Sequence, residues 1–187
     1  MIETQDKANL INEFKAGSMQ AFDRIVNLYR KQVFQTAYHF TGCYEDADDI
    51  SQEVFIQAYR SIGKLKENSK FSTWLQRITI NISINYLRKN SRHQNNETCT
   101  DEMTYLESFS TNIDPLFDME SKELTIEIRN AIVSLPVTER AVFILKAYQD
   151  LSYKEIAQVL KCPEGTVMSR LNRARRMLRD KLKDYVF

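Results

Sequence analysis

Apolar residues recur at three- and four-residue steps through much of this chain, and that spacing is typical of amphipathic α-helices. Between Gly17 and Gly42 the apolar series consists of Phe22, Ile25, Val26, Tyr29, Val33, Ala37 and Phe40. Ser18 can cap the start of this helix, and Gly42 can end it. The 187 residues include only 4 glycines and 3 prolines, which disfavours a turn-rich β fold. We therefore expect an all-α protein, with further helices over residues 44–62, from about 71 to 89, and over 138–148.

Charge divides the chain into three parts. Residues 91–122 contain two basic and seven acidic residues, although the whole chain has a formal net charge of only +1. This acidic stretch has no sustained helical or strand period, which is typical of a linker. We therefore expect two small helical domains, residues 1–92 and 123–187, joined by a flexible acidic linker at 93–122. The acidity either keeps the linker soluble and extended or lets it follow a positively charged groove in a partner.

The chain has no run of about 18 apolar residues, and its first residues are polar and acidic rather than basic and then apolar. These features predict a cytoplasmic protein that does not insert into a membrane. The three cysteines lack the C-x-x-C spacing of a zinc site. We expect no metal and no other cofactor.

The segment after residue 136 predicts a helix-turn-helix. Ser152 and Glu155 have the spacing of a capping box at the start of one helix. The residues 161–163 interrupt the helical pattern, and a new helix begins near Glu164. Two helices joined by a tight turn, the second of them basic, are typical of DNA-binding proteins.

The last helix separates its charged and apolar residues. At 100° per residue, Val167, Leu171, Ala174 and Leu178 form one apolar stripe. The opposite side carries Ser169, Asn172, Arg173 and Arg176, and Arg170 lies beside them. Arginine can pair with guanine and asparagine with adenine in the major groove. A solvated basic helix end is the simpler alternative, but it does not explain the capped helix and the turn that precede it.

Two stretches of the N-terminal half also carry polar patterns. Asp46, Asp49 and Glu53 share one helical face, which suits either a protein partner or, less well without a nearby histidine, a metal-dependent nuclease. Residues 70–92 interleave aromatic and basic side chains, as single-stranded DNA binding requires. A polar loop at 64–70 precedes them and could receive an extruded base. The alternative is that apolar members such as Trp74 only pack in the core.

Six segments in order resemble the sigma-70 superfamily of transcription factors, specifically its extracytoplasmic-function group. These segments are GSMQAF, DADDISQEVFIQAYRSI, FSTWLQRITINISINYLRK, LPVTERAVFILKAY, LSYKEIAQVL and CPEGTVMSRLNRARRML. The resemblance covers about residues 10–90 and 125–183. It implies a non-enzymatic initiation factor that binds core RNA polymerase, directs it to promoters and helps to melt the DNA. It also implies regulation by an anti-sigma factor. A stand-alone helix-turn-helix regulator is the alternative function.

The resemblance further implies roles for individual residues. Contacts with the polymerase are expected from Asp49, Gln52, Glu53, Ile56 and Tyr59. Contacts with the −10 element, including single-stranded bases, are expected from Leu65, Lys66, Asn68, Ser69, Lys70, Phe71, Arg77, Asn81, Asn85 and Arg88. Contacts with the −35 duplex are expected from Thr166, Ser169, Arg170, Asn172, Arg173 and Arg176. Met168 stands where many members of the family have a basic residue, so the preferred −35 sequence is not implied.

Overall fold

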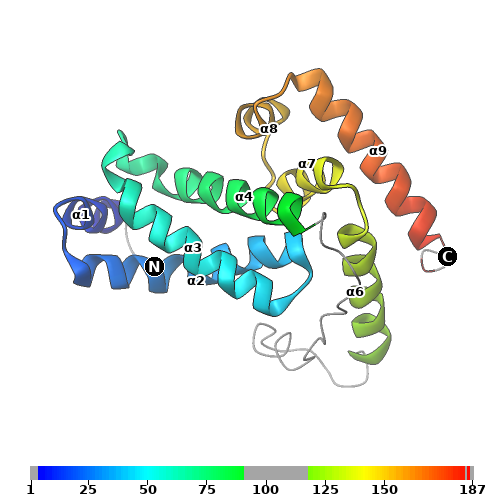
Figure 1. Ribbon diagram of the computed structural model, residues 1–187, viewed down its shortest axis with the longest axis horizontal. Coiled ribbons are helices and arrows are strands. Elements are labelled where there is room, and N and C mark those ends of the chain that lie inside the picture. The colour runs from blue at the N-terminus through cyan, green and yellow to red at the C-terminus, as the bar shows by residue number, and fades with distance from the viewer. Residues whose placement is uncertain (1–3, 91–117, 184, 186–187) are drawn as a thin grey trace.

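The computed structural model describes residues 4–90, 118–183 and 185, and these residues form helices and turns without any β-strand. The first group of helices comprises α1 (Thr4–Lys15), α2 (Met19–Thr41), α3 (Tyr44–Ser61) and α4 (Phe71–Asn90), with the short 3-10 helices η1 (Ile62–Lys64) and η2 (Asn68–Lys70) between α3 and α4. The second group comprises α6 (Asp118–Val133), α7 (Val137–Ala147), α8 (Tyr153–Leu160) and α9 (Glu164–Leu182). Figure 1 shows the two groups side by side. The all-α prediction is confirmed.

Helix α2 begins and ends at the two residues that the sequence predicted as its caps. The hydroxyl of Ser18 accepts a hydrogen bond from the backbone N–H of Ala21 at the start of α2. Gly42 ends α2 in the left-handed region, at φ 71°, and its N–H donates to the carbonyl of Tyr38. A residue with a Cβ atom adopts this conformation at a cost, which explains why glycine ends the helix.

Helix α6 was missed by the sequence interpretation. It begins at Asp118, inside the stretch that was expected to be linker, and residues 93–117 of that stretch lie outside the described residues. Two of its apolar side chains, Leu124 and Ile128, are exposed, whereas Ala131 and Ile132 at its end are buried. From Leu124 onward only the last turn of α6 is buried, so this part of the helix lacks the long apolar stripe that made the other helices recognisable.

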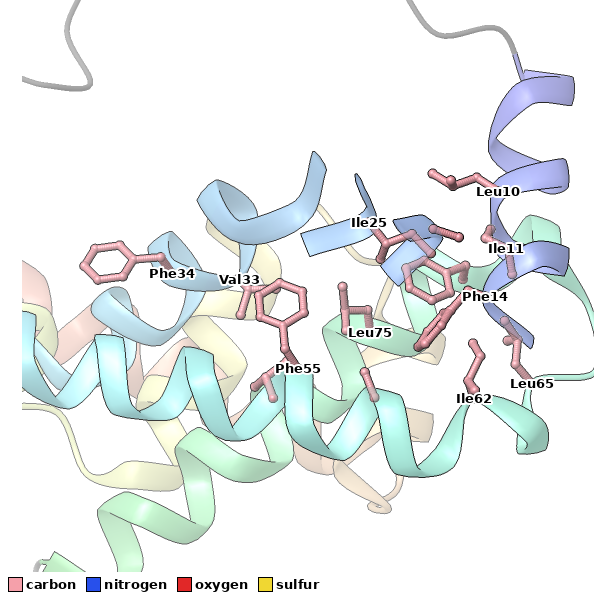
Figure 2. Close-up of a cluster of buried hydrophobic side chains, with 14 of the residues drawn as sticks. Leu10, Ile11, Phe14, Ile25, Val33, Phe34, Phe55, Ile62, Leu65 and Leu75 are labelled. Carbon is pink, nitrogen blue, oxygen red and sulfur yellow. The ribbon is translucent and has the colours of Figure 1, made fainter. Parts of the chain in front are cut away.

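The first group of helices surrounds one hydrophobic core. Phe14 of α1, Ile25 of α2, Val54 of α3 and Leu75 of α4 are all nearly inaccessible to solvent. Figure 2 shows Leu10, Ile11 and Phe14 along the side of α1 that faces this core. Burial of such side chains is the main stabilising contribution in a small helical domain.

A second hydrophobic core joins the two groups of helices. Phe40 of α2 and Ile84 of α4 are buried together with Ala141 and Ile144 of α7 and Leu171 of α9. In Figure 1, α7 lies against the C-terminal part of α4. The two groups are therefore not only tethered through the acidic segment, as the sequence suggested, but packed against each other.

Polar contacts reinforce this packing. The buried guanidinium of Arg140 on α7 donates to the carbonyl of Phe40 at 2.6 Å and also to the carbonyls of Val133 and Leu135. Its pKa is lowered to about 10 by burial, so it stays charged at neutral pH. The Gln149 amide donates to the Thr36 hydroxyl at 3.0 Å. The guanidinium of Arg140 therefore pairs with the carbonyls of Phe40 at the end of α2 and of Val133 at the end of α6, positions where a helix carbonyl has no partner inside its own helix.

Candidate nucleic-acid interface

Helices α8 and α9 form the helix-turn-helix that the sequence predicted. The Ser152 hydroxyl accepts from the backbone N–H of Glu155, while the Glu155 carboxylate accepts from the backbone N–H of Ser152 at 2.8 Å. This capping box satisfies donors that have no partner inside α8. The helix ends at Lys161 in the left-handed region, at φ 51°, and Pro163 precedes the first residue of α9. The backbone conformations of Lys161 and Pro163 therefore set the direction in which the chain leaves α8 and enters α9.

The outer face of α9 is polar and cationic. Val167, Leu171, Ala174 and Leu178 are buried, as the projected stripe predicted. On the opposite side, the exposed residues are Ser169, Asn172, Arg173 and Arg176, whereas Thr166 and Arg170 are half-buried at the edges. Met168 is 50% exposed near the start of the helix. This face has the shape and the donor groups to enter a major groove.

Arg173 has a partner that sequence reasoning did not identify. Its guanidinium lies 3.6 Å from the carboxylate of Glu139 on α7, a side chain only 9% exposed. Glu139 also accepts a hydrogen bond from the hydroxyl of Thr138. A buried carboxylate has little freedom to move, so it can restrict the directions in which the exposed Arg173 side chain points. No spacing in the sequence signals this contact, because Glu139 and Arg173 lie 34 positions apart in the chain.

Helix α4 carries a second polar face. Arg77, Asn81, Asn85 and Arg88 are exposed along one side of the helix. The Arg77 guanidinium reaches the carbonyl of Gln158 on α8 at 3.4 Å. The other side of α4 packs in the core through residues such as Leu75 and Ile80.

A cavity of about 190 Å³ lies where α4 meets the second group of helices. Asn81, Asn85 and Arg88 line it from α4, and Lys161 and Arg170 line it from α8 and α9. No Asp or Glu is among its lining residues. Residues expected to contact the −10 element and residues expected to contact the −35 element therefore line the same cavity.

The loop between α3 and α4 divides into buried and exposed positions. Leu65 and Phe71 are 7% and 1% exposed, so their side chains belong to the core, and we do not include them in the DNA surface. Lys66, Ser69 and Lys70 are exposed. Asn68 is half-buried, and its side chain is directed toward α1 rather than outward.

Helix α3 presents a mixed acidic and apolar face. Its expected contact residues Asp49, Gln52, Glu53, Ile56 and Tyr59 are all exposed, with Ile56 at 50% and Tyr59 at 44%. Exposed apolar side chains grouped with charged ones are typical of a protein-binding surface. Asp46 instead accepts a hydrogen bond from the hydroxyl of Tyr86 on α4. In the parts of the chain that the structure describes, no three histidine, cysteine or acidic residues come together as metal ligands would.

The fold defines an all-helical protein with a helix-turn-helix of the DNA-binding type. Two family models match the chain, Sigma-70 region 2 over residues 25–93 and Sigma-70, region 4 over residues 125–178. Among the helices of the described residues, none is long and apolar enough to cross a membrane.

Curated relatives resemble the chain over nearly its whole length. The ECF RNA polymerase sigma factor SigW of Bacillus subtilis is 37% identical, and the match covers 93% of this chain and 95% of the relative. The ECF RNA polymerase sigma-E factor of Haemophilus influenzae is 34% identical, with 98% of both chains covered. The chain belongs to the sigma-70 family, in its extracytoplasmic-function group, and is an alternative sigma factor for transcription initiation.

Solved structures share the fold. CnrH, in complex with the cytosolic domain of CnrY, gives a TM-score of 0.63 at 22% identity, and the match covers 96% of this chain and 98% of CnrH. The sigma factor RpoE of Bartonella quintana, in complex with the anti-sigma factor NepR, also gives 0.63 at 22% identity, covering 88% of this chain and 98% of RpoE.

Proposed function

We propose that this sigma factor binds core RNA polymerase through the exposed face of α3 and recognises promoters with α9 and α4. The cationic outer face of α9 is assigned to the −35 duplex. The exposed side of α4, together with Lys66, Ser69 and Lys70 of the preceding loop, is assigned to the −10 element. The observation that carries the proposal is that each of the two groups of helices has a polar face with basic side chains, and that α3 has a mixed acidic and apolar face, in a chain of this family. The stand-alone regulator is not favoured, because the relatives are sigma factors.

The packed arrangement of the two helix groups must open for this function. The −35 and −10 elements lie about 25 base pairs apart, which is about 85 Å of straight duplex at 3.4 Å per base pair. In the closed arrangement, Arg170 and Asn81 line the same cavity and cannot reach two elements separated by that distance. We therefore propose that binding to the polymerase separates the two groups and exposes both DNA faces.

A protein inhibitor could act by favouring the closed arrangement. The structures of CnrH and RpoE that share this fold were each determined in complex with a partner, which for RpoE is an anti-sigma factor. We propose an anti-sigma factor for this chain as well. A partner that binds only the closed form would lower the population of the DNA-binding form by mass action.

Transcription in vitro tests the proposal. The full chain and bacterial core polymerase should initiate from genomic fragments that core polymerase alone ignores. Replacing Asp49 and Glu53 with lysine should weaken the binding of core polymerase, whereas replacing Asp180, an exposed acidic residue of α9, should not. The absence of specific initiation across a genomic library, with the polymerase active on a control promoter, would refute the proposal.

A further inference from the structure

Asn68 lies in the loop that the proposed function assigns to single-stranded DNA, yet its side chain binds α1. Its Oδ1 atom accepts a hydrogen bond from the ammonium of Lys15 at 2.7 Å. Its Nδ2 atom donates to Oδ1 of Asn12 at 2.6 Å and to the carbonyl of Ala8 at 3.2 Å. An amide side chain has two donor hydrogens, and both are used in these contacts. Asn68 therefore has no donor left for a nucleic-acid base.

The helix that holds Asn68 is itself firmly attached to the core. Leu10, Ile11 and Phe14 on α1 are each at most 4% exposed. They belong to the same hydrophobic core as Ile62 and Leu65, which lie at the start of the loop, and α1 contacts both η1 and η2. The polar contacts of Asn68 thus connect the loop to a helix whose apolar side is buried in the core of the bundle.

Three points fix the loop, and the positions between them face solvent. Leu65 and Phe71 anchor its ends in the core, and Asn68 anchors its middle on α1. Lys66 and Ser69 lie between the anchors and are exposed. Without the middle anchor, the loop would keep its two buried ends and the local contacts between Glu67 and Lys70, but nothing in that set ties its middle to α1. A pocket for one base needs a restricted shape.

We infer that α1 supports the base-capturing loop and that Asn68 is a positioning residue, which transmits this support without contacting DNA. The inference rests on the proposed function of the loop. It also extends promoter recognition to α1, which lies before the residues 25–93 that match the family model. Changes on α1 should therefore alter how the sigma factor selects a −10 base.

The experiment uses holoenzyme assembled from the full chain and bacterial core polymerase. Its binding is measured on promoters that contain a pre-melted −10 region, with each non-template base substituted in turn. We expect Asn68→Ala and Asn12→Ala to reduce the preference at one −10 position by about fivefold, the ratio that corresponds to one net hydrogen bond. We also expect Asn12→Ala to have no further effect in the Asn68→Ala background.

The matched control is Asn9→Ala, which truncates the same kind of side chain at an exposed position of α1. This variant should leave the base preference unchanged at every −10 position. Unchanged base preference in both Asn12→Ala and Asn68→Ala would overturn the inference while leaving the proposed function intact. An equal loss at all −10 positions and at the −35 element would also overturn it, because that result indicates general unfolding. A wild-type holoenzyme without any base preference in the −10 element would overturn both the inference and the proposed function.

Discussion

Replacing Gly42 with alanine tests whether the two groups of helices are packed together in solution. Gly42 has φ 71°, and a Cβ atom added there would lie 2.5 Å from Cγ2 of Val133 on α6. The left-handed conformation costs a residue with a Cβ atom about 1–2 kcal/mol. Forcing an extra methyl group into the packed interface costs about 1–3 kcal/mol more. We therefore expect Gly42→Ala to lower the free energy of unfolding by about 2–5 kcal/mol.

Combining this change with Val133→Ala separates the two contributions. Removal of the Val133 methyl groups relieves the overlap and leaves only the backbone cost at position 42. The two substitutions should therefore be coupled by about 1–3 kcal/mol, the size of the packing term. Urea unfolding of the wild type, both single variants and the double variant measures this coupling.

A matched control is Gly63→Ala, because nothing lies within 4 Å of a Cβ atom at that position. It should change the free energy of unfolding far less than Gly42→Ala does. Additive effects of Gly42→Ala and Val133→Ala, within about 0.5 kcal/mol, would refute the packed arrangement, since distant sites are expected to add.

Three further predictions concern the DNA face, a helix cap and a half-buried histidine. Arg173→Ala should change which −35 sequence is preferred, whereas Arg176→Ala should weaken all promoters alike and reduce the salt dependence of binding by about one ion, as binding titrations at several salt concentrations would show. Ser152→Ala should lower the free energy of unfolding by about 1 kcal/mol in urea titrations, because the start of α8 loses its cap. Burial lowers the pKa of His39 to about 4 from 6.5, so the unfolded chain binds a proton more readily than the folded chain between these values. Stability should therefore fall as the pH decreases from 6.5 to 4, and urea midpoints of a His39→Phe variant should fall less over that range.

The sequence predicted most of the local structure correctly. Ser18, Gly42 and Ser152 marked helix ends, and each has the capping role that its type suggested. The apolar stripe and the arginine face of α9 also lie where helical spacing placed them. These features depend on residues up to four positions apart, and such neighbours meet on a helix whatever the rest of the chain does.

The roles of single site residues were less predictable. Phe71 resembled an aromatic platform for a base, but it is buried in the core. Asn68 resembled a DNA contact, but its partners lie 53 to 60 residues earlier in the chain. A polar residue in a loop has the same local pattern whether it faces solvent or another helix, so its sequence neighbours could not distinguish the two cases.

The sequence alone determined the helical class, the helix-turn-helix and the separation of charge from apolar surface, because each is encoded in local spacing. Only the tertiary structure decided that the two groups of helices share a core, that Arg140 reaches the carbonyl of Phe40, and that Glu139 approaches Arg173. These contacts join residues 34 to 100 positions apart. Their formation depends on how whole helices pack, and no periodicity within one helix carries that information.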